Sequence, residues 1–239
     1  MLPIIFLRDD IYELIRDPDK NKWLDFRIDI TWDEEKSKRL IAFRILRAID
    51  SNCTTILPFQ QAWQAVLGHA IALRGGKNHT KQINSFDYIA RSTLLRPRDF
   101  VSYLKSCAEE ALAQGGRLTP PIVRKVDRAF SRYLRDEFID ELFTVLPDIS
   151  KIFDVFSQIH KLNFTEKEFE DAYMLQVQNG DIKETNITFV MRVLYHFSVL
   201  GNNPEPERFV FRYQNRESQL SLRERLVVHR GLFKSLQIR

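Results

Sequence analysis

Two arginines flank a proline in the segment "LLRPRDF", and no other stretch of the sequence comes as close to a binding chemistry. Arg96 and Arg98 stand on either side of Pro97. Proline suits the first turn of a helix, where its missing N–H is not needed, so we expect a helix to begin here. A guanidinium at a helix N-terminus can hold phosphate oxygens through paired hydrogen bonds. The alternative is that Arg98 pairs with Asp87 or Asp99 as an exposed ion pair worth about 0–1 kcal/mol.

A third arginine, Arg8, follows the apolar run "LPIIFL". A short continuous apolar run predicts a strand that is buried on both faces, as in a parallel sheet. Residues at the carboxyl end of such a strand face the ligand crevice, so Arg8 could contact a phosphate. The alternative is a strand-end charge that faces solvent.

The C-terminal stretch is the most basic part of the chain. Residues 208–239 contain eight basic and two acidic side chains, a difference of 8 − 2 = +6, whereas the whole chain carries +4. In the predicted strand 208–214, apolar Phe209, Phe211 and Tyr213 alternate with polar residues. One basic face of this strand could contact a nucleic-acid backbone, or it could be a solvated strand face. The residues predicted for nucleic-acid binding are Arg208, Arg212, Arg216, Arg223 and Arg225.

Other chemistries find little support in the sequence. The five histidines are scattered without metal-ligand spacing, so we expect no metal site. No nucleophile elbow or dinucleotide-binding loop is present, so we assign no catalytic residue. Cys53 and Cys107 belong to no C-x-x-C pair, and we expect buried thiols.

The composition is that of a globular protein. Of the 239 residues, 44% are hydrophobic and 12% aromatic, which predicts a core rich in aromatic rings. No apolar run reaches the roughly 18 residues that a membrane span requires. The apolar start lacks a basic leader, so we expect a cytoplasmic protein that does not contact a membrane.

The elements that must position these arginines are mostly helical. Strands are expected over 2–8 and 24–32, with a short helix over 9–17 between them, and a capping box of Thr31 and Glu34 predicts the next helix. Two strands are marginal alone, so we interpret them as the remnant edge of an α/β domain. The alternative is that the first strand packs on the helices that follow. Further helices are predicted over 34–49, 60–73, 85–95, 96–114, 118–146, 147–159, 163–176 and 184–201.

The order of elements near the C-terminus predicts a winged helix. A capping box of Thr165 and Glu168 begins one helix, another helix is expected to end at Gly201, and strands over 208–214 and 225–229 would form a ribbon. The predicted fold is therefore mainly α, a helical bundle with a C-terminal winged-helix domain and a remnant α/β edge at the N-terminus. We expect domains over 1–50, 51–160 and 161–239.

Four blocks of the sequence carry a resemblance: "IIFLRDDIYELI", "DITWDEEKSKRLIAFRI", "FDYIARSTLLRPRDFVSYL" and "LVVHRGLFKSL". Together they resemble the C-terminal half of prokaryotic P-loop ATPases of the AAA+/STAND-like group, in which a helical lid and a winged helix follow the nucleotide-binding core. The resemblance implies that Arg98, with Arg96 and Arg8 nearby, descends from residues that sense a nucleotide phosphate.

The chain departs from this family at the nucleotide itself. It contains no G-x-x-x-x-G-K-[ST] phosphate loop, and Gly75-Gly76-Lys77 lacks both the preceding strand and the following Ser or Thr. We therefore expect no cofactor bound by this chain alone, with ATP and Mg²⁺ implied only if a P-loop core is supplied. The first functional hypothesis is a lid and winged-helix part that senses nucleotide state and relays it.

Two other hypotheses stay open. The chain could be a stand-alone module that binds DNA or RNA through its basic C-terminus, or a protein-interaction scaffold. An incomplete sheet edge at the N-terminus could recruit a P-loop core or a second copy of the chain.

Overall fold

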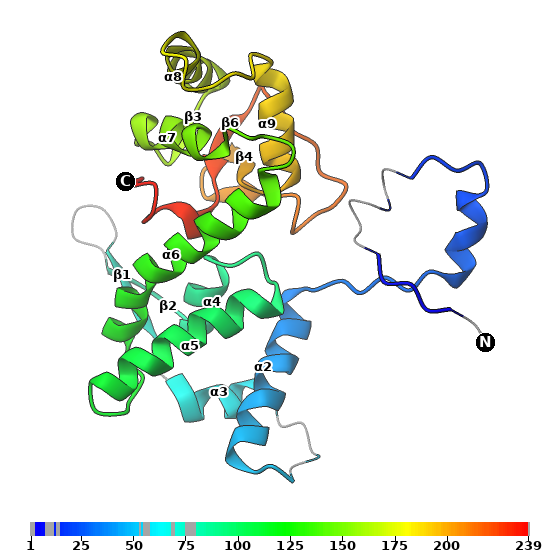
Figure 1. Cartoon of the computed structure of the whole chain (residues 1–239). Coiled ribbons are helices and arrows are strands. Elements are labelled where there is room, and N and C mark those ends of the chain that lie inside the picture. Colours follow the sequence, from blue (N-terminus) through cyan, green and yellow to red (C-terminus); the bar gives the residue numbers. More distant parts are fainter. Residues whose placement is uncertain are drawn as a thin grey trace. The chain divides into compact units, whose positions relative to one another are not determined.

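The computed structural model describes residues 3–7, 12, 15–52, 54, 58–67, 70–74 and 80–238. The chain divides into two compact units, Met1–Thr31 and Trp32–Arg239. This division does not coincide with the boundaries expected near residues 50 and 160, and the three-domain division stays a prediction. The larger unit is mainly α-helical (Figure 1), as the sequence predicts.

The first unit contains a short 3₁₀ helix, η1, over Lys20–Phe26. Its contacts gather on Tyr12, whose ring lies 4.4 Å from both the Lys20 ammonium and the Arg27 guanidinium. The Tyr12 and Trp23 rings lie 6.4 Å apart. One aromatic ring between two cations thus organises this unit.

The strands predicted over 2–8 and 24–32 are not formed. Residues 3–7 and 27–31 pair with no strand, and residues 24–26 belong to η1. Ile4 and Phe6 are 83% and 84% exposed. A strand needs a hydrogen-bonding neighbour, and the described residues of this unit offer none. The α/β edge therefore remains a proposal that requires another chain or segment, and most of the helix expected over 9–17 lies outside the described residues.

The second unit begins with two helices and a hairpin. Helix α2 (Glu34–Ile49) starts at Asp33, whose carboxylate accepts a hydrogen bond from Lys36 N–H at 2.8 Å. The expected capping box of Thr31 and Glu34 is therefore wrong, because the helix begins two residues later. Helix α3 (Phe59–Leu67) packs on α2.

The helix expected over 60–73 is too long. It ends at Leu67, and β1 (Ile71–Arg74) then pairs antiparallel with β2 (Thr80–Ile83). The glycine-containing segment 75–79 between these strands lies outside the described residues. The two strands form because they pair with each other, which helical periodicity within either segment does not reveal.

The centre of the unit is built on three helices, α4 (Ser85–Ala90), α5 (Pro97–Ala113) and α6 (Pro120–Leu142). Pro97 occupies the first turn of α5, as expected. Gly115 and Gly116, both with positive φ, end the helix, and Gly116 N–H donates to Ala111 C=O at 2.7 Å. Helices α5 and α6 run side by side (Figure 1).

The C-terminal part combines three helices with a four-stranded sheet. Its helices are α7 (Ile149–Ile159), α8 (Glu166–Gln178) and α9 (Ile187–His196). Its strands are β3 (Asn163–Phe164), β4 (Leu200–Glu205), β5 (Arg208–Val210) and β6 (Arg225–Val228). The capping box of Thr165 and Glu168 is present at the start of α8.

The sheet differs from the expected ribbon. Its strand order is β3-β6-β4-β5 with antiparallel pairs, so β4 lies between β5 and β6. The helix expected to end at Gly201 is shorter, because α9 ends at His196 and Gly201 belongs to β4. After β6 the chain forms a short 3₁₀ helix, η2 (Arg230–Leu232), which packs on α6.

The core is rich in aromatic rings, as the composition predicts. Phe86 and Phe100 stack at 5.5 Å between α4 and α5. Phe156 lies within 5.9 Å of Phe164 and within 5.4 Å of Phe169, joining α7, β3 and α8. Cys107 is fully buried on α5, as expected, while Cys53 lies outside the described residues.

Candidate functional site

The two arginines at the start of α5 are aimed at two carboxylates on α6. The two terminal nitrogens of the Arg96 guanidinium donate to the two carboxylate oxygens of Glu141, at 2.7 Å and 3.3 Å. Arg98 pairs with Glu137 at 2.9 Å and also donates to Glu141. The partners are therefore on α6, and neither is Asp87 or Asp99. Two guanidinium groups and two carboxylates form a locally neutral group, which we call the Arg–Glu cluster.

The side chains of the Arg–Glu cluster differ in how much of each is exposed to solvent. The Glu141 side chain is 16% exposed, that of Arg96 33% and that of Arg98 49%. A shared, bidentate carboxylate in a half-buried position stabilises more than an isolated surface pair. Arg98 is consequently the member of the cluster that a solvent-borne ligand reaches most easily.

The loop that presents Arg96 is fixed from within. Asp99, in the first turn of α5, accepts a hydrogen bond from Leu94 N–H at 2.9 Å. Ser37 Oγ of α2 donates to Leu95 C=O at 3.1 Å, and Leu95 adopts a positive φ of 58°. Burial raises the pKa of Asp99, against the hydrogen bond from Leu94. The loop over residues 91–96, which we call the arginine loop, is thus rigidly placed.

The arginine loop also contacts the segment that follows β6. A Cβ atom on Gly231 would lie 2.2 Å from Ser92 C=O, so only glycine allows the two backbones to approach this closely. His229 is buried beside the loop; burial lowers its pKa to about 3, with the backbone of Thr93 acting in the opposite direction. The loop that carries Arg96 is therefore packed directly on the chain leaving the sheet.

A buried carboxylate lies nearby without access to substrate. Asp127 of α6 accepts hydrogen bonds from Tyr88 at 2.5 Å and from Tyr103 at 2.6 Å. Burial, and then the Asp127 charge, raise the pKa of Tyr88 to about 12 and that of Cys107 to about 12. The raised pKa values keep Tyr88 and Cys107 protonated, and the hydrogen bonds to Asp127 hold α4, α5 and α6 together.

The arginines predicted to bind nucleic acid lie on different elements. Arg208 on β5 pairs with Glu205 at 3.5 Å, and Arg225 is an exposed residue of β6. Arg212 donates to Arg216 C=O at 2.9 Å in the connection between these strands, which also carries Arg223. Glu205 at the end of β4 and Glu207 in the turn before β5 lower the positive charge at this end of the sheet.

The expected alternation of apolar and basic faces is only partly present. Strand β5 ends at Val210, before Phe211 and Tyr213. Phe211 is buried and lies 5.3 Å from the His229 ring, whereas Phe209 is 40% exposed. The role of the five C-terminal arginines stays a prediction.

Several other residues considered in the sequence lie outside the described residues. Arg8 lies outside the described residues, as do Gly75-Gly76-Lys77, His69 and His79. Among the residues that the structure describes, no group of His, Cys, Asp or Glu side chains could hold a metal ion. No helix within the described ranges is both long and apolar enough to cross a membrane.

Sequence reasoning missed a set of basic residues on α6. Arg124, Arg128, Arg132 and Arg135 are spaced by four, four and three residues, which places them on one face of the helix. This spacing was readable in "RKVDRAFSRYLR". The structure adds Lys234 of the C-terminal segment to the same surface.

The comparisons with known proteins gave one match. Residues 38–139 match a family model described as FunZ-associated C-terminal helical domain. The matched segment runs from α2 to near the end of α6 and includes the arginine loop, Arg98 and Glu137, but it ends before Glu141. No curated protein and no solved structure matches the chain. The match supports a helical domain here and covers less than half of the 239 residues.

Proposed function

We propose that the chain is a non-catalytic part of a P-loop ATPase, a helical lid followed by a winged helix, which senses nucleotide state and relays it. The observation that carries this proposal is the packing of the arginine loop on Gly231 and His229, just after β6. The arginine loop thereby connects Arg96 and Arg98, which are proposed to contact a phosphate, to the C-terminal sheet. The resemblance in sequence and the description of the matched family as a C-terminal helical domain agree with such a part.

The Arg–Glu cluster would act as the sensor. A guanidinium carries five N–H donors, so Arg98 can keep Glu137 and still offer donors to a phosphate oxygen. The N-terminus of α5 adds a favourable dipole for an anion at this place. Glu141 competes with the phosphate for both arginines, so nucleotide binding would shift their partners and move the arginine loop.

The C-terminal part would receive the movement of the arginine loop and contact the partner. The order α7, β3, α8, α9, β4, β5, β6, with β6 between β3 and β4, is the order of a winged helix, in which β4 and β5 form the wing. Winged helices bind both nucleic acids and proteins. The exposed face of α9 carries Phe189 and Arg192, a mixed surface that suits a protein partner as well as a nucleic acid.

The nucleotide itself would come from elsewhere. The sequence contains no phosphate loop, so ATP and Mg²⁺ would be held by a P-loop core in another segment or chain. Residues 3–7 offer such a core an extended apolar segment, with Ile5 79% exposed. A second copy of this chain is the alternative partner for that segment.

The test compares the chain alone with the assembly isolated from its source through a tag on this chain. ATP and Mg²⁺ should leave the thermal melt of the chain alone unmoved, and should raise the melting temperature of the assembly. Arg98→Ala should reduce this nucleotide-dependent shift, because one phosphate ligand is lost. Lys105→Ala is the matched control, since Lys105 is an exposed cation further along α5.

Glu141→Gln should change the nucleotide-dependent shift in melting temperature in the opposite direction. It removes the carboxylate that competes for both arginines, so the nucleotide-dependent shift of the assembly should grow. An assembly without any nucleotide-binding component, or a shift that ignores Arg98→Ala, would contradict the proposal.

A further inference from the structure

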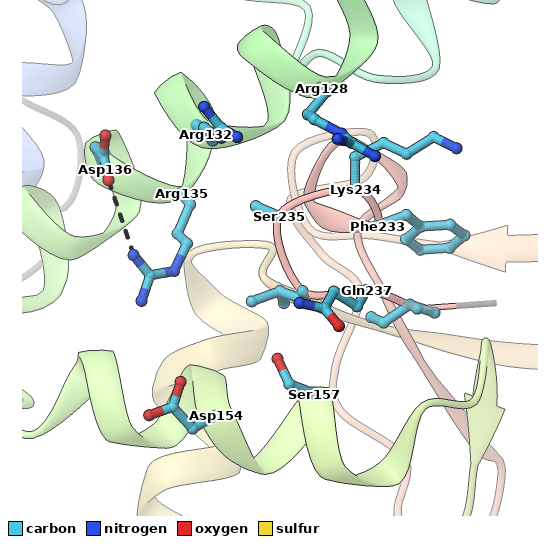
Figure 2. A pocket seen from close by; sticks show the side chains of 12 residues that line it. Arg128, Arg132, Arg135, Asp136, Asp154, Ser157, Phe233, Lys234, Ser235 and Gln237 are labelled. Carbon is cyan, nitrogen blue, oxygen red and sulfur yellow. Dashed lines mark ion pairs between the residues drawn. The ribbon is translucent and has the colours of Figure 1, made fainter.

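A basic groove lies between α6, α7 and the C-terminal segment, away from the Arg–Glu cluster. Figure 2 shows side chains of α6 on one side, Lys234 and Gln237 of the C-terminal segment on another, and Ser157 and Asp154 of α7. The groove has a volume of about 870 Å³, and an adjoining hollow of about 470 Å³ extends it toward the start of α6. Both share Arg128, Arg132 and Lys234. We call this surface the α6 groove.

The cations of the α6 groove differ in how far they are neutralised. Lys125 pairs with Glu110 at 2.5 Å, and Arg135 lies 3.9 Å from Asp136. Arg124 donates to Ala72 C=O at 3.2 Å, which leaves its charge uncompensated. Within the described part of the chain, Arg128 and Lys234 make no ion pair or hydrogen bond, and the same holds for Arg132.

The spacing of these cations suits a repeating anion. In a helix that rises about 1.5 Å per residue, the step from Arg124 to Arg135 spans roughly 16 Å. A single phosphate would meet only one or two of the four arginines of the stripe. A duplex nucleic acid carries one negative charge per about 1.7 Å of its axis, so it can contact the whole stripe.

The wall that carries Lys234 is fixed in place. Ser235 N–H donates to Ser131 Oγ at 2.9 Å, and the two hydroxyl groups lie 3.0 Å apart. His160 Nδ1 lies 3.3 Å from Gln237 C=O, which ties the segment to the end of α7. The C-terminal segment therefore presents Lys234 opposite α6 without first having to fold onto it.

The walls also indicate what the groove does not bind. Phe233 is 8% exposed, and Leu236 is fully buried, so no aromatic platform is open for stacking bases. A surface that inserts into a membrane would need apolar side chains between the lipids, and Ile238 is also buried. Asp136 and Asp154 limit the positive charge at one end. What remains is a concave, polar and cationic surface.

We propose that the α6 groove binds the phosphate backbone of duplex nucleic acid without reading its sequence, through Arg124, Arg128, Arg132 and Lys234. This site is distinct from the basic C-terminal strands predicted from sequence, and it goes beyond the proposed relay. Binding here would place the helical domain itself on the nucleic acid.

The experiment measures fluorescence anisotropy of a labelled random-sequence duplex of about 24 base pairs with the full chain, from about 50 to 200 mM salt. We expect affinity to fall steeply with salt and to change little when the sequence is scrambled. The double variant Arg128→Gln and Arg132→Gln should weaken binding tenfold or more and reduce the salt slope by about two, about one for each lost phosphate contact.

Three controls make the result decisive. Arg39→Gln with Arg44→Gln removes the same charge from the exposed surface of α2 and should leave binding nearly unchanged. Arg208→Gln with Arg223→Gln tests the C-terminal strands instead, and a larger loss there than in the groove variant would overturn the proposal. Vesicles rich in phosphatidylserine test a lipid ligand, and binding to them but not to the duplex would also overturn it. Circular dichroism verifies that each variant is folded.

Discussion

Single residues at the junction between the arginine loop and the C-terminal segment combine burial with titratable chemistry. His229 is 1% exposed and accepts a hydrogen bond from Gly231 N–H through Nδ1 at 3.2 Å. A neutral imidazole fits this site, whereas an imidazolium would have to be buried beside the cation of Arg96. His229, two residues before the glycine that permits the close packing, therefore makes the junction sensitive to acid.

We predict that the junction loses stability as the pH falls below neutrality. Burial lowers the pKa of His229 to about 3 from the ordinary value of 6.5, so the unfolded chain binds a proton more readily than the folded one. The contribution of His229 to stability is fully present above about pH 6.5 and is lost as the pH falls toward 3. Urea unfolding midpoints of the full chain between these pH values provide the measurement.

The matched comparison uses two variants. His229→Gln should make the dependence of unfolding free energy on pH shallower by up to one proton, even if the variant is less stable overall. His196→Gln changes an exposed histidine of α9 and should leave the slope as it is. Equal slopes in all three proteins would show that His229 is not the group responsible.

At the scale of elements, the sequence predicts those helix starts that depend on residues close together in the chain. The proline in the first turn of α5 and the capping box of α8 mark two helix starts that the structure confirms. These signals involve residues within four positions of one another, so a single segment contains them.

Strands were harder to predict, because a strand depends on pairing with segments outside itself, and a partner can lie far away in the sequence, as β3 and β6 do. Strand β4 contains "NNPE", a poor strand sequence by propensity. It forms because it pairs with both β5 and β6, and because the side chain of Asn202 donates to Ser221 C=O at 2.6 Å and accepts from Ser221 N–H at 3.1 Å. Conversely, the apolar run over 3–7 looks like a strand but finds no neighbour among the described residues.

Only part of the candidate site could be predicted from the sequence. The sequence identified Arg96 and Arg98, but their carboxylate partners are 39 to 45 positions away and depend on how α5 packs on α6. The stripe on α6 was visible as a spacing, whereas Lys234 joins it only through the fold of the C-terminal segment.

The start of α8 gives a prediction at this scale. Thr165 Oγ accepts a hydrogen bond from Glu168 N–H at 3.2 Å, and Glu168 in turn accepts from Thr165 N–H at 2.8 Å. Thr165→Ala should lower the free energy of unfolding by about 1 kcal/mol, because one end of the helix loses its cap. Chemical denaturation measures the change. Thr188→Ala, at an exposed position within α9, is the control; a loss no larger than in that control would contradict the assigned cap.

At the scale of the whole molecule, a single helix, α6, carries residues of both proposed sites. Helix α6 carries Glu137 and Glu141 for the Arg–Glu cluster near one end and the basic stripe along the rest of its length. Segment η2 packs on this helix and lies between the sheet and the arginine loop. A displacement of the arginine loop would therefore be transmitted to the C-terminal part through packed backbone.

The central claim is that nucleotide state at the arginines is relayed to the sheet, and amide hydrogen exchange tests it most directly. The assembly isolated through this chain would be compared with a non-hydrolysable ATP analogue and with ADP. The account predicts that exchange in residues 91–96 and in residues 225–232 changes together between the two nucleotides, and that Arg98→Ala abolishes both changes. Identical exchange with either nucleotide, or a change confined to residues 91–96, would contradict the relay.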